Sequence, residues 1–278
     1  GRWPNGAPFY AMKLVEGDDL TKLIERAPDL DERLGLLTKM IAVCEAIAYA
    51  HDQRIIHRDL KPSNVVVGEF GETLIVDWGL AKDLDADDVA DVDDGTYRSN
   101  ATPELTRSGD IVGTPAYMAP EQARGDKLDP RTDVYALGAM LYHALAGVPP
   151  YNARTATDVI AAAALGKVVP LLERERRAPR DLVAIIERAM AQAPEERYPH
   201  AGELADELRR FLTGQLVDAH RYTTLQRVAR FVRRHRAAVT IGVVASVAFA
   251  VLGSVAVGRI VRARDHAERE SQIANTRK

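Results

Sequence analysis

The sequence predicts an α+β fold that is mostly helical, with a few strands at its front edge, followed by one transmembrane helix. Three observations support this prediction. Helical periodicity continues from Pro120 to residue 213 with short interruptions. Two short apolar runs flank a glycine-containing turn in residues 64–77, NVVVGEFGETLIVD, which predicts a β-hairpin. Residues 237–258 contain no charged side chain.

The first predicted elements are a strand and a long helix. The strand lies in PFYAMKLVEG, residues 8–17, and ends at Gly17. The helix is predicted to begin with Asp31 as its cap and to continue to His51. Apolar residues at helical spacing form a wide stripe, which indicates a mostly buried helix: Leu34, Leu37, Met40, Ile41, Val43, Cys44, Ile47 and Ala48.

Net charge and cysteine content argue against a strongly basic nucleic-acid-binding protein and against a disulfide-stabilised protein. The net charge is −3, so no overall positive field indicates a nucleic-acid partner. Cys44 is the single cysteine, which rules out a disulfide within one chain and suits a reducing cytoplasm; we interpret it as a small core residue. The charge is uneven, because residues 83–94 hold seven aspartates and residues 221–236 hold six arginines. Residues 83 to about 110 lack periodicity and predict a long loop.

The uncharged segment 237–258 has the length of a membrane span. Its 22 residues would form a helix of about 33 Å, and the hydrocarbon core of a bilayer is about 30 Å thick. Arginines crowd both ends and the segment has no polar face, which favours a transmembrane helix over a buried helix of a soluble domain.

The residues with catalytic potential gather in IIHRDLKPSNVVV, residues 55–67. Phosphoryl transfer needs a carboxylate that orients the attacking hydroxyl, and cations that neutralise the phosphate oxygens. Asp59 and Lys61 provide such groups. Asn64 on the same loop and Asp77 of VDWG provide the oxygen ligands that Mg²⁺ prefers. The order and spacing of these residues therefore predict machinery for phosphoryl transfer.

With these motifs, the chain resembles the C-terminal lobe of a bacterial eukaryotic-like (Hanks-type) Ser/Thr protein kinase, from about residue 8 to residue 213. The resemblance implies that Asp59 is the catalytic base, that Lys61 contacts the transferred phosphate, and that Asn64 and Asp77 hold the metal ions. The implied cofactors are ATP and Mg²⁺. Trp78 stands where the family usually has phenylalanine, and we expect this change to be tolerated.

A second group of motifs matches the same family. GTPAYMAPEQ, residues 113–122, resembles its substrate-docking segment. Thr114 would then bond to Asp59 and Lys61, a feature of Ser/Thr specificity.

The resemblance also implies a structural group. Glu121 would pair with Arg197 of PEERYP, and Asp133 of TDVYALG would hold the backbone of the catalytic loop from below. These three residues are scaffolding in the family and take no part in the chemistry.

The resemblance also assigns a nucleotide pocket. Met12 would guard the back of the adenine site, and Val66 would form its floor; a plain core role for both side chains stays open. Backbone groups of Lys13 and Val15 would bond adenine, and Asp19 would reach the ribose.

The long loop resembles an activation loop. Arg58 offers a guanidinium that a loop phosphate can pair with. Thr106 and Ser108 are the expected phosphorylation sites, and Thr96, Ser99 and Thr102 are outside candidates.

A glycine-rich phosphate loop and its strand lysine are not found upstream of the motifs. Two explanations remain: the chain is part of a longer membrane-anchored kinase, or it is a pseudokinase scaffold that binds protein partners. The retained loop residues favour the first explanation, and we expect residues 1–278 alone to show no turnover.

The expected organisation is a remnant of the N-lobe and hinge (1–16), the kinase C-lobe (17–213), a basic juxtamembrane linker (214–236), the transmembrane helix (237–258) and the start of a truncated external segment (259–278).

Arginines on the two sides of the span predict a single-pass protein of the cell membrane with the kinase lobe in the cytoplasm. Small residues recur at every fourth position of the span and predict a homodimer contact, although the high content of small residues makes this spacing weak support: Gly242, Ser246, Ala250, Ser254 and Gly258. The expected partners are thus Ser/Thr-containing protein substrates, membrane lipid and a second copy of the chain, with no nucleic acid.

Overall fold

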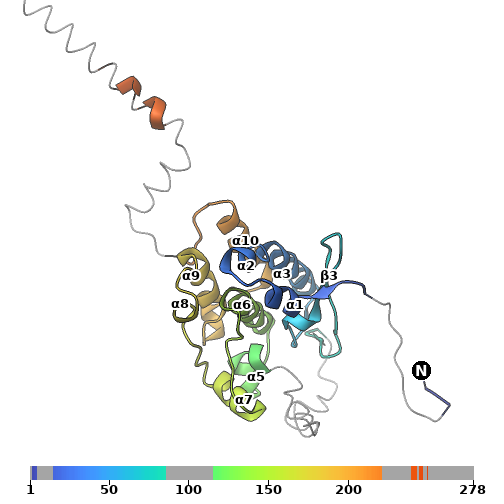
Figure 1. The fold of residues 1–278 in the computed structure, drawn as a ribbon. Coiled ribbons are helices and arrows are strands. Elements are labelled where there is room, and N and C mark those ends of the chain that lie inside the picture. Colours follow the sequence, from blue (N-terminus) through green and yellow to red (C-terminus); the bar gives the residue numbers. More distant parts are fainter. Residues whose placement is uncertain are drawn as a thin grey trace, which may run out of the picture. The chain divides into compact units, whose positions relative to one another are not determined.

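The computed structural model describes residues 2–4, 15–85, 115–220, 239–242, 244–246 and 249. The chain forms two units, residues 1–220 and 221–278, and each is described by itself. Figure 1 shows the first unit as a helical domain with a few short strands. The mostly helical kinase-type fold predicted from the sequence agrees with this architecture.

The first unit begins with a short strand and three helices. These are β1 (Asp18–Asp19), α1 (Leu20–Arg26), α2 (Leu30–Leu34) and α3 (Leu37–Asp52). The predicted strand ended at Gly17, whereas the observed strand is β1, and residues 8–14 lie outside the described residues.

The predicted cap and continuity of the long helix were wrong. Asp29, and not Asp31, accepts the capping hydrogen bond from Glu32 N at 2.9 Å. The helix is interrupted at Gly35, where Gly35 N donates to Glu32 O at 3.0 Å and Leu36 N donates to Arg33 O at 3.1 Å. These i→i−3 bonds tighten the turn, and glycine is a weak helix former, so α2 ends at Leu34 and α3 begins at Leu37.

Helix α3 lies in the core, as its apolar stripe predicts. Met40, Val43, Cys44 and Ile47 are fully buried. By length and composition, the stretch Leu30–Asp52 is the one part of the described residues that could cross a bilayer. A core helix of a folded domain has the same length and composition, and the buried residues of α3 fit that interpretation.

Two small antiparallel sheets lie beside these helices. The predicted hairpin is present as β3 (Val65–Val67) and β4 (Thr73–Ile75), in the order β1-β3-β4 with Val66 opposite Leu74. The second sheet pairs β2 (Ile55–Ile56) with β5 (Lys82–Asp83). Between them, the 3₁₀ turn η1 (Pro62–Asn64) leads directly into β3. The catalytic motif therefore lies on a loop anchored by a strand at each end.

The second half of the domain is helical, as the periodicity predicts. After the 3₁₀ turn η2 (Pro115–Tyr117) come α5 (Pro120–Arg124), α6 (Pro130–Ala146), α7 (Ala156–Ala164), α8 (Leu171–Arg174), α9 (Arg180–Ala189), the 3₁₀ turn η3 (Pro194–Glu196) and α10 (Ala201–Leu212). Helix α6 is buried along almost its whole length and contacts α3, α9 and α10 (Figure 1). Asp129 caps it by accepting from Arg131 N at 2.8 Å, and the left-handed Gly147 ends it.

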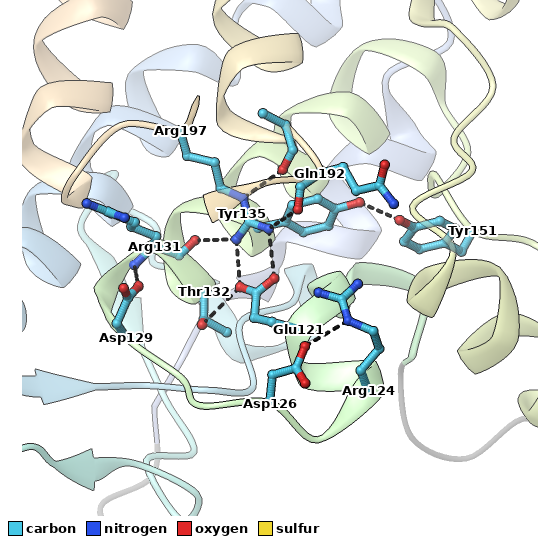
Figure 2. A network of polar contacts seen from close by, with 11 residues as sticks. Glu121, Arg124, Asp126, Asp129, Arg131, Thr132, Tyr135, Tyr151, Gln192 and Arg197 are labelled. Carbon is cyan, nitrogen blue, oxygen red and sulfur yellow. Dashed lines mark hydrogen bonds and ion pairs between the residues drawn. The ribbon is translucent and has the colours of Figure 1, made fainter. Parts of the chain in front are cut away.

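A buried ion pair joins three parts of this helical half. Arg197 donates to both carboxylate oxygens of Glu121, at 2.6 and 2.7 Å, as the resemblance implies (Figure 2). Thr132 Oγ1 also donates to Glu121, at 3.1 Å. The Arg197 guanidinium further donates to the carbonyl oxygens of Ala191, Arg131 and Gln192. All of its donors are thus used, so this buried charge is compensated on every side.

In the second unit, the described part of the segment 237–258 is helical. These residues are 239–242, 244–246 and 249. Ser246 Oγ donates to Gly242 O at 2.8 Å, while Ile241, Val244 and Phe249 are 68%, 62% and 76% exposed. The other residues of the predicted span lie outside the described part of the chain.

The Arg197–Glu121 pair generates a prediction about stability. We expect Arg197→Met to lower the free energy of unfolding by about 3–5 kcal/mol, because it leaves the Glu121 carboxylate buried without its cation. Urea unfolding of the two proteins would measure this. The control is Arg124→Met, which removes an exposed ion pair with Asp126 and should cost less than about 1 kcal/mol. Equal losses in the two variants would contradict the assignment.

Candidate functional site

The loop after β2 brings together two predicted catalytic residues, Asp59 and Lys61, and one predicted metal ligand, Asn64. Lys61 Nζ lies 2.7 Å from Asp59 Oδ2. Asn64 Nδ2 donates to Asp59 O at 2.9 Å and approaches Asp59 Oδ2 at 3.3 Å. The side chains of Lys61 and Asp59 are 16% and 18% exposed, so the cluster is held by the protein and still open to a reactant. The side chains are close together, as their spacing on one loop indicates, while their roles in catalysis and metal binding stay predictions.

Asp133 holds the backbone of this loop. Its carboxylate accepts from His57 N at 2.8 Å and from Arg58 N at 2.9 Å. It also lies 3.0 Å from His51 Nε2. Arg58 has a φ of +70°, a left-handed conformation that is unfavourable for a long side chain. The two hydrogen bonds from backbone amides to the Asp133 carboxylate therefore stabilise a turn that the chain would otherwise avoid.

His51 is a residue of this site that the sequence reasoning missed. It lies on α3 and is 6% exposed. Its Nε2 meets Asp133, and its Nδ1 accepts from Ala201 N at 3.4 Å, at the start of α10. The signal that could have found it is a polar residue on the buried face of an apolar helix, because such a group needs partners.

His57 connects the catalytic loop to the segment that carries Asp77. Asp59 N donates to His57 Nδ1 at 3.3 Å, so Nε2 carries the proton toward Val76 O at 3.4 Å. The His57 and Trp78 rings lie 4.6 Å apart, centroid to centroid. Trp78 Nε1 donates to Ile75 O at 3.2 Å, a bond that a phenylalanine at this position could not make.

The two predicted metal ligands lie on neighbouring segments. Val76 N donates to Asn64 O at 2.9 Å, which brings Asp77 next to the loop. Asp77 is exposed and left-handed, with a φ of +62°. Asn64 directs its Nδ2 to Asp59, so its Oδ1 points away from Asp59. Asn64 Oδ1 and the Asp77 carboxylate oxygens suit a hard cation such as Mg²⁺.

Within residues 15–85 and 115–220, no group of three or more His, Cys, Asp or Glu could hold a metal ion by itself.

The predicted nucleotide residues are only partly described. Met12 and Lys13 lie outside the described residues, while Val15 and Val66 are half-buried. Asp19 caps α1 by accepting from Lys22 N at 3.1 Å. Burial alone would raise the pKa of this carboxyl, but the bonds and charge of Lys22 outweigh it and lower the pKa below its usual value. Asp19 thus has a structural role that the sequence reasoning did not foresee.

The described part of the substrate-docking segment begins at Pro115, because Thr114, Thr106 and Ser108 lie outside the described residues. Tyr117 OH and His143 Nδ1 form a hydrogen bond of 2.7 Å. Both residues are buried, and burial lowers the pKa of His143 to about 4 and raises that of Tyr117. A neutral histidine of α6 therefore anchors this segment, and the sequence reasoning missed this residue as well.

Arg58 has further contacts with its surroundings. Gln122 Nε2 donates to Arg58 O at 2.7 Å. Arg58 Nε is buried without a hydrogen-bond partner among the described residues. A buried donor of this kind suits an anion supplied by another part of the chain.

Comparisons with known proteins agree with this geometry. The profile of the family described as "Protein kinase domain" matches residues 7–208. The serine/threonine-protein kinase PknD of Protochlamydia amoebophila is 34% identical over 231 residues, which cover 74% of this chain and 22% of that protein. PknB of Mycobacterium tuberculosis is 31% identical over 230 residues, which cover 80% of this chain and 34% of that protein.

The chain therefore belongs to the protein kinase family, in its bacterial Hanks-type Ser/Thr group. It spans only 22% to 34% of the length of these two relatives.

The buried Tyr117–His143 pair predicts a pH dependence of stability. The pKa of His143 is about 4 when folded and about 6.5 when unfolded. Between these values the unfolded chain binds more protons, so stability falls as the pH drops below 6.5. From pH 7 to pH 5, His143 should contribute a loss of about 2 kcal/mol.

Urea unfolding at pH 7 and pH 5 measures this loss. His143→Gln should reduce the difference between the two pH values by that amount, whereas Tyr117→Phe keeps the buried histidine and should retain the difference. An unchanged pH dependence in His143→Gln would refute the assignment.

Proposed function

We propose that the protein transfers the γ-phosphate of ATP to serine or threonine hydroxyls of other proteins. The observation that carries this proposal is the Asp59–Lys61–Asn64 cluster on a loop held by Asp133. The family membership supports the same reaction, and the names of the two relatives support Ser/Thr specificity.

Each residue of the cluster has a defined task in this mechanism. The Asp59 carboxylate orients the substrate hydroxyl and accepts its proton as the phosphoryl group is transferred. The Lys61 ammonium lies against Asp59 Oδ2. From this position it also neutralises negative charge on the transferred phosphoryl group. Asn64 and Asp77 would hold Mg²⁺, and the bound cation would supply positive charge against the phosphate oxygens of ATP.

We propose that residues 17–213 form the C-lobe of this kinase and that the phosphate-covering lobe belongs to the same protein. The exposed apolar residues near the hairpin support a covering partner, since Phe70 is 96% exposed and Leu74 is 46% exposed. The alternative is a pseudokinase scaffold, which the absence of phosphotransfer in the activity experiment would favour.

The test is phosphotransfer by the protein expressed from its complete gene, with MgATP and a Ser/Thr substrate protein. Asp59→Asn should lower kcat by about 10²–10⁴-fold, because the hydroxyl loses its base. Asp52→Asn is the matched control; Asp52 is exposed at the end of α3 and should leave activity unchanged. No transfer by the wild-type protein, or equal activity in Asp59→Asn, would reject the proposal in favour of the scaffold.

We also propose that residues 237–258 anchor the protein in the cell membrane, with the kinase domain in the cytoplasm. The helical conformation of the described residues of this segment and the exposure of Ile241, Val244 and Phe249 support a lipid-facing helix. The arginines that precede it in 221–236 support the orientation.

Membrane fractionation tests the anchor. Ile241→Arg with Val244→Arg should release the protein from membranes, since each arginine costs about 2.5–3.5 kcal/mol inside a span. Leu212→Arg changes an exposed residue of α10 and should leave the protein in the membrane fraction. Protease treatment of intact spheroplasts should spare the kinase domain; its digestion there would overturn the orientation.

A further inference from the structure

We propose that Gln122 is a positioning residue for Asp59, and that it links the substrate-docking segment to the catalytic loop. The proposal rests on the kinase activity proposed above. The Gln122 side chain donates from Nε2 to Arg58 O at 2.7 Å. This carbonyl belongs to the peptide bond that precedes Asp59, so its direction sets the backbone of the catalytic residue.

The Arg58 backbone is strained and needs support on both sides. Its φ of +70° lies in the left-handed region, which disfavours a residue with a side chain. Asp133 fixes the amide of Arg58 at 2.9 Å, and Gln122 fixes its carbonyl. The Arg58 amide belongs to the peptide before this residue and its carbonyl to the peptide after it, so neither peptide can rotate without breaking a hydrogen bond.

Rotation of the peptide between Arg58 and Asp59 would disturb the catalytic contacts directly. Asp59 N donates to His57 Nδ1 at 3.3 Å, and Asp59 O accepts from Asn64 at 2.9 Å. Both contacts depend on the backbone direction at Asp59. A displaced backbone would move the Asp59 carboxylate away from Lys61, which it meets at 2.7 Å.

The helix that carries Gln122 is itself fixed by buried contacts. Glu121, the preceding residue, is held by Arg197 and Thr132 (Figure 2). Pro120 begins α5, and the left-handed Gly125 ends it. Because Glu121 points to Arg197, the next side chain leaves the helix in another direction and reaches Arg58. The ion pair in Figure 2 is thereby connected to the catalytic loop through one amide.

Glutamine suits this task because its neutral amide can donate to a carbonyl oxygen. A glutamate of the same shape would place a negative oxygen against that carbonyl when ionised. Gln122 also closely follows the 3₁₀ turn η2, where Tyr117 is bonded to His143. Gln122 therefore connects the segment that follows η2 to the left-handed turn at Arg58.

Two measurements test this inference. Gln122→Met keeps the length of the side chain and removes the donor. In the protein expressed from its complete gene, kcat should fall about tenfold while KM for ATP stays within about twofold. The control Gln192→Met also removes an amide-to-carbonyl bond, from Nε2 to Leu165 O at 3.3 Å on an exposed surface, and should leave kcat unchanged.

The second measurement is amide hydrogen exchange of the 278-residue chain, which does not depend on activity. Gln122→Met should speed exchange at Arg58 and Asp59 and leave α6 protected. Unchanged exchange at these two amides, or an equal increase throughout α6, would overturn the inference. So would a kcat within twofold of the wild type. If the wild-type protein proves inactive, the proposed function fails, while the exchange experiment still decides the role of Gln122.

Discussion

The geometry of the candidate site depends on one buried carboxylate, that of Asp133. It is 1% exposed and meets the amides of His57 and Arg58 and the ring of His51. A carboxylate in such a place is costly unless hydrogen bonds replace its hydration. The loop must therefore turn two consecutive amides toward it, and this requirement explains the left-handed conformation of Arg58. The fold supplies the carboxylate, and the carboxylate imposes the shape of the loop.

The first turn of α6 serves two networks at once. Asp133 holds the catalytic loop, while the adjacent Thr132 bonds Glu121 and the carbonyl of Arg131 accepts from Arg197 (Figure 2). The carboxylate of Asp133 also benefits from the positive end of the helix dipole. Since the rest of α6 is packed between other helices, this turn is a fixed reference point. The catalytic loop and α5 are both positioned relative to it.

Sequence reasoning recovered the local features of the fold. The family resemblance supplied two contacts between distant segments, Glu121 with Arg197 and Asp133 with the catalytic loop, and other long-range contacts were missed. The spacing of HRDLKPSN predicted the Asp59–Lys61–Asn64 cluster because these residues share one tight loop, and the β3–β4 hairpin and buried α3 followed from local periodicity. The predicted cap at Asp31 was wrong because Asp29 caps α2, and the predicted continuity was wrong because Gly35 interrupts the helix. His51 and Gln122 meet their partners across 82 and 64 residues of sequence. No periodicity within a single element encodes such separations.

The distribution of buried polar residues explains why these long-range contacts are hydrogen bonds. Apolar contacts stabilise a core without direction, whereas a hydrogen bond fixes both distance and angle. In the described part of the chain, most buried polar residues belong to the catalytic loop, the Glu121–Arg197 network or the Tyr117–His143 pair; Asp181 and Glu207 lie outside these groups. Apolar helices therefore provide stability, and directional contacts concentrate where a carboxylate must be held in one position. Helix α5 contributes to two of these groups through the adjacent residues Glu121 and Gln122, which makes it the physical connection between the Arg197 network and the loop that carries Asp59.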